Sequence, residues 1–436
     1  MHKNFKNFII VWIGQFISIL GSGISAFGLS LWVYMNTESA TTFAMTFLVQ
    51  ILPGIIFAPM AGSLADRKKR KSVVIITDSL DAIIKVILVV LLLTGQMKVW
   101  MVYPLTFISQ TLGTFQNPAF NAMIPLMVEK KDVARANGFM QMIMAIQNML
   151  SPIVAGALFP VIGLKGLFII DFITFFVALF TILPQQINQD LEENKSKNLA
   201  GTLVDDIKIA SKLLKSKQGF IELIVVFSLL NFVANIAIVL VGPLVMSNYD
   251  TRIYGMINSV SGVAMVIGGL ISGALPSENN KVRSIFVSLI ISSIGMIVMG
   301  ISPLWIVIAI GFFLFMLPTP YANGTLGSLL QLKIATKMLG RVGSLVNCLM
   351  KIVTPIAIIL SGILADKVFN PLLIEGGKLA NTFIGEIIGV GEGRGIGLLF
   401  VICGFILLII CISMLFNKNV SDLERLNPDV IEDWFS

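Results

Sequence analysis

The segment Gly62-Ser-Leu-Ala-Asp66-Arg67-Lys-Lys-Arg70-Lys71 ends one long apolar run, residues 42–64, and precedes another, residues 73–95. Each run has the roughly 20 mostly apolar residues that a helix needs to cross a bilayer. Charged side chains are costly inside the hydrocarbon core. The five consecutive cations from Arg67 to Lys71 therefore predict a short aqueous turn between two membrane helices.

Composition extends this prediction to the whole chain of 436 residues. Apolar residues make up 56% and charged residues 13%, which is about half of the usual globular share of charge. One histidine and three cysteines, the latter all in apolar runs, give no metal-binding set and no disulfide framework. Phosphate-loop, dinucleotide, metalloprotease and hydrolase motifs are absent from the sequence. We expect an all-α integral membrane protein that is not an enzyme and uses no cofactor.

Twelve runs are long and apolar enough to cross the membrane as helices. They lie near residues 8–34, 42–64, 73–95, 99–123, 134–160, 166–184, 219–246, 253–275, 284–301, 303–330, 338–364 and 394–416. The first run follows two lysines but is too long for a signal peptide. The pattern predicts six spans, a long polar connection and six more spans.

The distribution of positive charge predicts the topology. If the amino terminus is cytoplasmic, cytoplasmic segments hold 23 of the 31 Lys and Arg residues, external loops hold six, and Lys85 and Lys351 fall inside spans. Such an excess marks the cytoplasmic side. We therefore expect a multi-pass plasma-membrane protein with both termini in the cytoplasm. The net charge of +7 reflects this topology and could attract anionic lipid, and it gives no reason to expect nucleic acid as a partner.

The predicted organisation has four parts. They are a bundle over residues 1–184, a cytoplasmic linker over 185–218, a second bundle over 219–416 and a tail over 417–436. In the linker, Thr202 and Asp205 match a capping box before an amphipathic pattern. This helix lies either on the inner membrane surface or in solvent. Ser421 and Glu424 form a similar pattern in the tail.

Five motifs are spread along the chain, namely Gly62-x3-Asp66-Arg67-x2-Arg70-Lys71, Gly113-Thr-Phe-Gln-Asn-Pro-Ala-Phe-Asn-Ala-Met-Ile-Pro125, Ala136-Asn-Gly138, Leu339-Gly-Arg-Val-Gly-Ser-Leu345 and Leu360-Ser-Gly-Ile-Leu-Ala-Asp366. Together they resemble motifs of the major facilitator superfamily, in particular of its macrolide-efflux branch from Gram-positive bacteria. The resemblance implies two six-helix pseudo-repeats, a monomer and exchange of a drug for protons. Two positions depart from the pattern, because Lys69 replaces a usual glycine and Ser109 replaces an arginine found in many proton-coupled members.

The same resemblance implies a cytoplasmic gate. In that family the motif's aspartate engages the amino end of helix 11 and a cation there. The corresponding residues in this chain are Gly62, Asp66, Arg67, Arg70, Lys71 and Arg341. The alternative is that the cations only anchor the loop in the cytoplasm.

Polar side chains recur at helical spacing in several spans. They are Gln15, Ser18, Ser22 and Ser25 in the first span, Gln110, Asn117 and Asn121 in the fourth, Asn231 and Asn235 in the seventh, and Asn323 in the tenth. They either bond neighbouring helices or line a substrate cavity, and the resemblance implies the cavity for helices 1, 4, 7 and 10. On another face of the first span, Gly14, Gly21 and Gly28 predict close packing against a second helix.

Ionisable residues inside spans are candidates for proton coupling. Asp81 lies near the middle of the third span, and Lys85 follows one turn later on the same face, so that an internal ion pair is the simpler interpretation. Asp171 and Glu222 have no obvious partner in their own helices. All three acids remain coupling candidates.

The function that we expect is export of hydrophobic, macrolide-type drugs by alternating access, and the resemblance implies that protons drive it. A cavity rich in phenylalanine and methionine would suit bulky amphiphiles. A siderophore, a lipid or a peptide is an alternative cargo, and a non-transporting membrane sensor is a remoter alternative.

Overall fold

The computed structural model describes residues 5–185, 199–274 and 280–430, which form helices joined by turns and contain no strand. The predicted all-α fold is confirmed. Contacts between residues divide the chain into two compact units, Met1–Lys195 with Tyr249–Gly262, and Ser196–Asn248 with Val263–Ser436. The division into six-helix halves at the linker stays a prediction.

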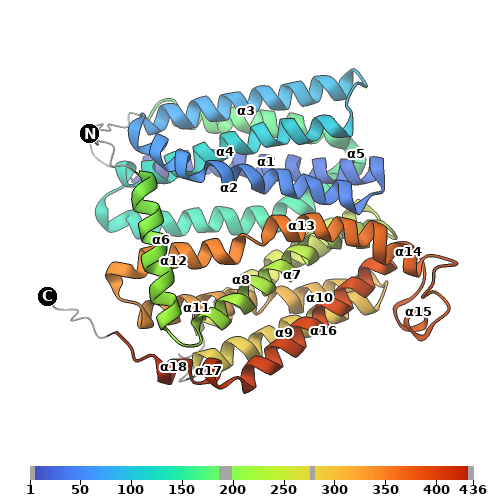
Figure 1. Cartoon of the computed structure of the whole chain (residues 1–436). Helices are drawn as coiled ribbons and strands as arrows, with labels where there is room; N and C mark the ends of the chain where they lie inside the picture. Colours follow the sequence, from blue (N-terminus) through green and yellow to red (C-terminus); the bar gives the residue numbers. More distant parts are fainter. Residues whose placement is uncertain (1–4, 186–198, 275–279, 431–436) are drawn as a thin grey trace. The chain divides into compact units, whose positions relative to one another are not determined.

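The first unit contains the helices that carry the motif Gly62-x3-Asp66-Arg67-x2-Arg70-Lys71, which we call the signature motif (Figure 1). It also contains the coupling candidates Asp81 and Asp171. Its elements are α1 (Phe5–Thr37), α2 (Ala40–Arg67), α3 (Arg70–Leu93), α4 (Val99–Met127), the short 3-10 turn η1 (Lys130–Asp132) and α5 (Val133–Ile182). Helix α2 ends at Arg67 and α3 begins at Arg70, so that the predicted tight turn is confirmed. Ser39 caps α2 by accepting a hydrogen bond from the Thr42 amide.

Helix α5 consists of two helices that run in opposite directions. Gly163 interrupts it with a φ of 64°, which a glycine adopts without strain. Before this glycine, α5 runs parallel to α1, since Trp12 donates to the Phe139 carbonyl and Gly23 lies against Ser151. After Gly163, later residues of α5 contact earlier residues of α1, so that this half of α5 runs antiparallel to α1. The two predicted spans at 134–160 and 166–184 are thus both present.

The glycines of α1 allow this second contact. A Cβ added at Gly14, Gly21 or Gly28 would collide with Thr181, Thr174 or Leu167 respectively. The three contacted residues also repeat every seven positions, in the opposite direction. The predicted close packing of the glycine face is confirmed, and its partner is the second half of α5.

The second unit contains the remaining helices. They are α6 (Leu199–Ser216), α7 (Phe220–Met246), the later part of α8 (Thr251–Ala274), α9 (Lys281–Ile301), α10 (Trp305–Met316), α11 (Thr319–Lys333), α12 (Thr336–Lys351), α13 (Thr354–Ile363), the π-helical segment η2 (Leu364–Phe369), α14 (Asn370–Leu373), α15 (Phe383–Ile388), α16 (Arg394–Phe416), α17 (Lys418–Ser421) and α18 (Leu423–Leu426).

Two spans predicted as single helices are interrupted. The run at 303–330 is split into α10 and α11, and Pro320 stands in the first turn of α11. The run at 338–364 is split into α12 and α13, and Pro355 stands in the first turn of α13. Proline cannot donate the backbone hydrogen bond of a continuing helix, whereas it fits the first turn of a new one.

The linker helix α6 begins at Leu199, earlier than predicted, so that Thr202 lies inside the helix and is not its cap. The side chains of Thr202 and Asp205 are outside the described part of the chain. Ala210 and Leu214 are buried against the rest of the unit, and α6 contacts α7 and α12. It crosses the ends of these helices rather than running along them (Figure 1).

Nine stretches of the described residues are long and apolar enough to span a membrane. One of them, Lys130–Ile182, contains the reversal at Gly163 and so has room for two crossings. Helices α3 and α4 are not among the nine, although each has the length to cross. Each of the twelve predicted runs falls on helix, and their number as membrane crossings stays a prediction.

The segment between α13 and α16, to which the sequence assigns no role, folds back onto its own unit. Leu373, Ile388 and Leu398 form a small apolar cluster. The buried side chain of Arg394 donates through Nε to the Ile388 carbonyl at 2.7 Å and through Nη2 to the Gly300 carbonyl at 2.8 Å. This arginine joins α15, α9 and α16.

Candidate functional site

Lys85 of α3 lies between two carboxylates in the first unit. Its Nζ is 3.9 Å from Asp81 Oδ2, one turn earlier in the same helix, and 3.2 Å from Asp171 Oδ2 in α5. The ring of Phe168 completes the surroundings, with its centroid 5.9 Å from Nζ. The predicted Asp81–Lys85 pair is confirmed, and the lysine has a second, nearer partner on another helix.

Hydroxyl groups from two further helices bind the carboxylates. Ser22 and Ser25 of α1 donate to Asp171 at 2.8 and 2.5 Å. Ser109 of α4 donates to Asp81. Helices α1, α3, α4 and α5 therefore meet at one polar cluster, which we call the acid–lysine cluster and which consists of Ser22, Ser25, Asp81, Lys85, Ser109 and Asp171.

The two carboxylates differ in exposure and in donors. The Asp171 side chain is 4% exposed and accepts hydrogen bonds from two serines, in addition to its ion pair. The Asp81 side chain is 27% exposed, and its contact with Lys85 is longer. Asp78, one turn earlier in α3, lies close enough to Asp81 to interact electrostatically. With one lysine for Asp81 and Asp171, the cluster has one negative charge in excess when both acids are ionised.

The polar stripe of α1 divides between two environments. Ser22 and Ser25 donate hydrogen bonds to Asp171 of α5. For these two serines the structure therefore shows interhelical hydrogen bonding, which was one of the two alternatives for the polar stripe. Gln15 is 2% exposed and accepts a 3.4 Å hydrogen bond from Gln116 of α4. Its side chain also interacts with the carboxyl group of Asp78 in α3. Ser18 is half-buried.

The candidate cavity residues of the other spans also differ in exposure. Asn117 and Asn121 of α4 and Asn323 of α11 have exposed side chains, whereas Gln110 is half-buried. An exposed amide in the middle of a membrane helix is unfavourable against lipid and favourable against water. These three asparagines therefore suit an aqueous cavity.

Asn231 and Asn235 of α7 are half-buried and make hydrogen bonds inside their own unit. Asn231 donates to the Phe227 carbonyl at 3.0 Å, and Asn235 donates to the Asn231 carbonyl at 2.7 Å. Asn235 also approaches Thr354 Oγ1 of α13 at 3.4 Å. Part of their hydrogen-bonding capacity is therefore used within the protein.

Two residues of the signature motif bind backbone carbonyls near the carboxyl ends of α4 and α5. Arg70 donates through Nη1 to the Ala122 carbonyl of α4 at 2.7 Å. Lys71 donates to the carbonyls of Leu183 and Gln185 at 2.6 and 2.7 Å, directly after the end of α5. A cation at a helix carboxyl end is favourable.

The gate itself stays a prediction. Gly62, Asp66 and Arg67 lie in the last turns of α2, but the side chains of Asp66 and Arg67 are outside the described part of the chain. Arg341 lies in α12, is exposed and approaches Met338 Sδ at 3.8 Å.

Glu222 does not join the acid–lysine cluster. It is half-buried in the first turn of α7, where a carboxylate interacts favourably with the helix dipole. Among the described residues, no group of three or more His, Cys, Asp or Glu side chains could hold a metal ion.

Sequence spacing could reveal the pairing of Asp81 with Lys85, since both lie in one helix. It could not reveal Asp171 as the nearer partner, because that contact depends on how α3 and α5 pack. A partial signal was present. Ser22 and Ser25 lie on one face of α1, as a carboxylate on a neighbouring helix requires.

Comparison with known proteins gives the relatives of this chain. The family model described as "Major Facilitator Superfamily" matches residues 11–358. Macrolide efflux protein A of Streptococcus pyogenes is 29% identical over 378 residues, which cover 84% of this chain and 91% of that protein. The staphyloferrin A transporter of Staphylococcus aureus is 23% identical over 171 residues, which cover 39% of this chain and 43% of that protein.

Among solved structures, a bacterial homologue of the human lysosomal transporter Spinster, in an inward-facing and unoccupied conformation, has a similar fold. Its TM-score is 0.69 at 14% identity, with 97% of each chain covered.

Proposed function

The chain belongs to the major facilitator superfamily, and from this premise we propose that it exports macrolide-type hydrophobic drugs in exchange for protons. It is a membrane transporter and not an enzyme. The observation that carries the drug-export proposal is the 29% identity with macrolide efflux protein A over 91% of that protein's length. We propose a monomer in the plasma membrane with both termini in the cytoplasm.

The exposed amides support a substrate cavity of limited polarity. Asn117 and Asn121 on α4 and Asn323 on α11 offer donors and acceptors without a fixed charge. Small numbers of polar groups in an apolar site orient a ligand, while apolar contacts supply most of its affinity. We propose that these residues contact the drug, and that Gln15, Ser18 and Gln110 of the first unit and Asn231 and Asn235 of the second unit also contact it.

The acid–lysine cluster supports proton coupling, and we propose Asp81 as the group that exchanges the proton. A coupling group must change its charge during the cycle. Asp171 is poorly suited to this role, since its carboxylate is nearly inaccessible and is bound by a lysine and two serines. Asp81 has the longer ion pair and the more exposed carboxylate. Protonation of Asp81 would leave the Lys85–Asp171 pair intact and remove the excess charge.

The cluster also offers an explanation for an unusual residue. Ser109 stands where many proton-coupled members have arginine, and it donates to Asp81. We propose that Lys85, approaching from α3, provides the cation that this position of α4 lacks. The energy available is adequate, because one proton falling through about 120 mV yields about 2.8 kcal/mol, enough for a roughly hundredfold gradient of a neutral drug.

A cell-based assay tests the export proposal. The protein is expressed in a macrolide-sensitive Gram-positive strain, and accumulation of a radiolabelled macrolide is measured with and without an uncoupler. We expect lower accumulation than in empty-vector cells, and the difference should vanish with the uncoupler. Accumulation equal to that of empty-vector cells under both conditions would refute macrolide export, whereas an uncoupler-insensitive reduction would refute only the proton-driven mechanism.

A siderophore is the alternative cargo that a specific observation favours, namely the partial similarity to the staphyloferrin A transporter. A siderophore with several carboxylates would need cations in the cavity, whereas the exposed candidate residues Asn117, Asn121 and Asn323 are amides. Accumulation of a labelled siderophore in the same cells decides between the two cargos.

A further inference from the structure

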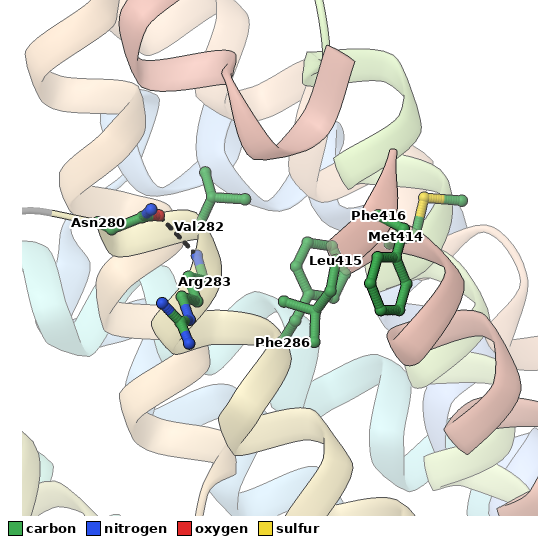
Figure 2. Close-up of a pocket in the computed structure, with 7 residues that line it drawn as sticks. All are labelled: Asn280, Val282, Arg283, Phe286, Met414, Leu415 and Phe416. Carbon is green, nitrogen blue, oxygen red and sulfur yellow. Dashed lines mark hydrogen bonds between the residues drawn. The ribbon is translucent and has the colours of Figure 1, made fainter. Parts of the chain in front are cut away.

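A pocket of about 310 Å³ lies in the second unit, where α9 begins and α16 ends. Its lining residues are Asn280, Val282, Arg283, Phe286, Met414, Leu415 and Phe416. Figure 2 shows the polar side chains of Asn280 and Arg283 on one side of this pocket and Met414 and Phe416 on the other. We call it the α9–α16 pocket.

The walls of this pocket are apolar. Phe286 is fully buried at 0% exposure, whereas Phe416 is 82% exposed. Both belong to helices that are long and apolar enough to cross a membrane. An aromatic side chain as open as Phe416, next to an apolar hollow, needs an apolar neighbour from outside the protein.

Arg283 is the cation at the rim, and its guanidinium makes no hydrogen bond or ion pair with another described residue. The nearby backbone donors are already occupied. The Arg283 amide donates to Asn280 Oδ1 at 3.1 Å, and the Val282 amide donates to Glu424 Oε1 at 3.0 Å. The exposed guanidinium therefore remains as the main donor available to an anion.

The position of the pocket identifies the kind of partner. Positive charge predicts that the start of α9 and the end of α16 are at the cytoplasmic surface of the membrane. A ligand there finds a cation at the level of the headgroups and apolar walls extending along two membrane helices. The cytoplasmic leaflet carries anionic lipids that basic residues attract. Arginine binds phosphate oxygens in a bidentate fashion.

We propose that the α9–α16 pocket binds one anionic phospholipid of the inner leaflet. Its phosphate binds the Arg283 guanidinium, and the Asn280 amide provides a second donor. The upper part of an acyl chain packs against Phe286, Met414 and Phe416. The volume is at the lower end of the range of small-molecule sites, which suits one chain segment better than a bulky drug.

The test measures lipid retained by the full-length purified protein. The protein in neutral detergent is titrated with phosphatidylglycerol or with phosphatidylcholine, and bound lipid is counted by native mass spectrometry. We expect one tightly retained phosphatidylglycerol and weaker retention of phosphatidylcholine. Arg283→Gln should weaken phosphatidylglycerol binding about tenfold, because it removes a charge-assisted hydrogen bond.

Two further variants make the result specific. Arg425→Gln removes an equally positive, exposed residue of the same unit that does not line the pocket, and it should leave binding unchanged. Phe416→Ser alters an exposed side chain, so that folding should be normal, and it should weaken binding severalfold. Equal losses in Arg283→Gln and Arg425→Gln would overturn the proposal in favour of general charge attraction.

Two competition experiments distinguish other ligands. If millimolar inorganic phosphate displaces the lipid and Phe416→Ser has no effect, the pocket is only an anion site and the proposal fails. If a macrolide displaces the lipid, the pocket belongs to the substrate pathway and the proposal also fails. Retention of the lipid in both experiments supports it.

Discussion

Lys85 Nζ lies 3.2 Å from Asp171 Oδ2, so that a salt bridge joins α3 to α5 inside the first unit. The side chains of this pair are 11% and 4% exposed. Buried charges of this kind require a partner, since an unpaired ion in a medium of low dielectric constant is strongly unfavourable. This salt bridge supports the proposal that Asp171 has a structural role and that Asp81 exchanges the proton.

The first prediction concerns the stability of this salt bridge. Lys85→Met leaves Asp171 buried without a cation, which should cost about 3–5 kcal/mol of folding free energy and lower the Tm in detergent strongly. Lys85→Met combined with Asp171→Asn should recover most of the loss. Asp81→Asn is the matched control, and it should lower the Tm only slightly because Lys85 still forms its ion pair with Asp171. Equal losses in Lys85→Met and Asp81→Asn would contradict the assignment.

The second prediction concerns the packing of α1 against α5. Gly21→Val places a branched side chain against Thr174 and the backbone of Asp171. Overpacking of this kind typically costs about 1–3 kcal/mol, and we expect a lower Tm and a lower yield of monodisperse protein. Gly54→Val is the control, since a Cβ at Gly54 has no neighbour within 4 Å. The packing argument fails if both variants have the same Tm.

The third prediction concerns the signature motif. Asp66→Asn keeps the size of the side chain and removes its charge, so that insertion should be normal while drug export falls severalfold or more. Glu129→Gln removes an exposed carboxylate from the turn that follows α4 and should have wild-type export. Export by both variants is measured in the accumulation assay. Wild-type export by Asp66→Asn would show that the motif serves only as a topological anchor.

The fourth prediction concerns the tail, residues 417–430. Lys333, at the end of α11, is 5% exposed and binds Asp429 at 2.7 Å and the Glu424 carbonyl at 2.9 Å. Asn427 donates to the Gln218 carbonyl before α7. Lys333→Met should therefore release the tail and increase its amide hydrogen exchange at least tenfold.

Lys418→Met provides the comparison for the tail, because Lys418 is exposed. In the Lys418→Met variant, the amide hydrogens of the tail should exchange as slowly as those of the wild type. If Lys333→Met also exchanges at the wild-type rate, the ion pair does not hold the tail in place.

Sequence predicted the helices far better than the contacts between them. Apolar runs of membrane length are a strong local signal, and each run falls on helix. Pro355 is apparent in the sequence, but the sequence does not show that the helix is interrupted there. A proline in a membrane helix can either be accommodated or end the helix. The glycine repeat of α1 predicted close packing but not its partner.

The polar contacts were harder to predict because they depend on tertiary packing. Glu424 in the tail resembled half of a local capping box, yet it accepts a hydrogen bond from Val282 at the start of α9. Asp171 has no partner in its own helix, and in the structure it is the less exposed of the two carboxylates in the acid–lysine cluster. In each case the partner lies more than 80 positions away in the sequence.

The most direct test of drug–proton exchange uses purified protein in liposomes. With an acidic lumen and a neutral exterior, wild-type protein should accumulate an external radiolabelled macrolide, and collapse of the pH gradient should abolish accumulation. Asp81→Asn should lose this response while still exchanging labelled for unlabelled macrolide at equal pH. Wild-type accumulation that does not depend on the pH gradient, or an unaltered response in Asp81→Asn, would contradict proton coupling at Asp81.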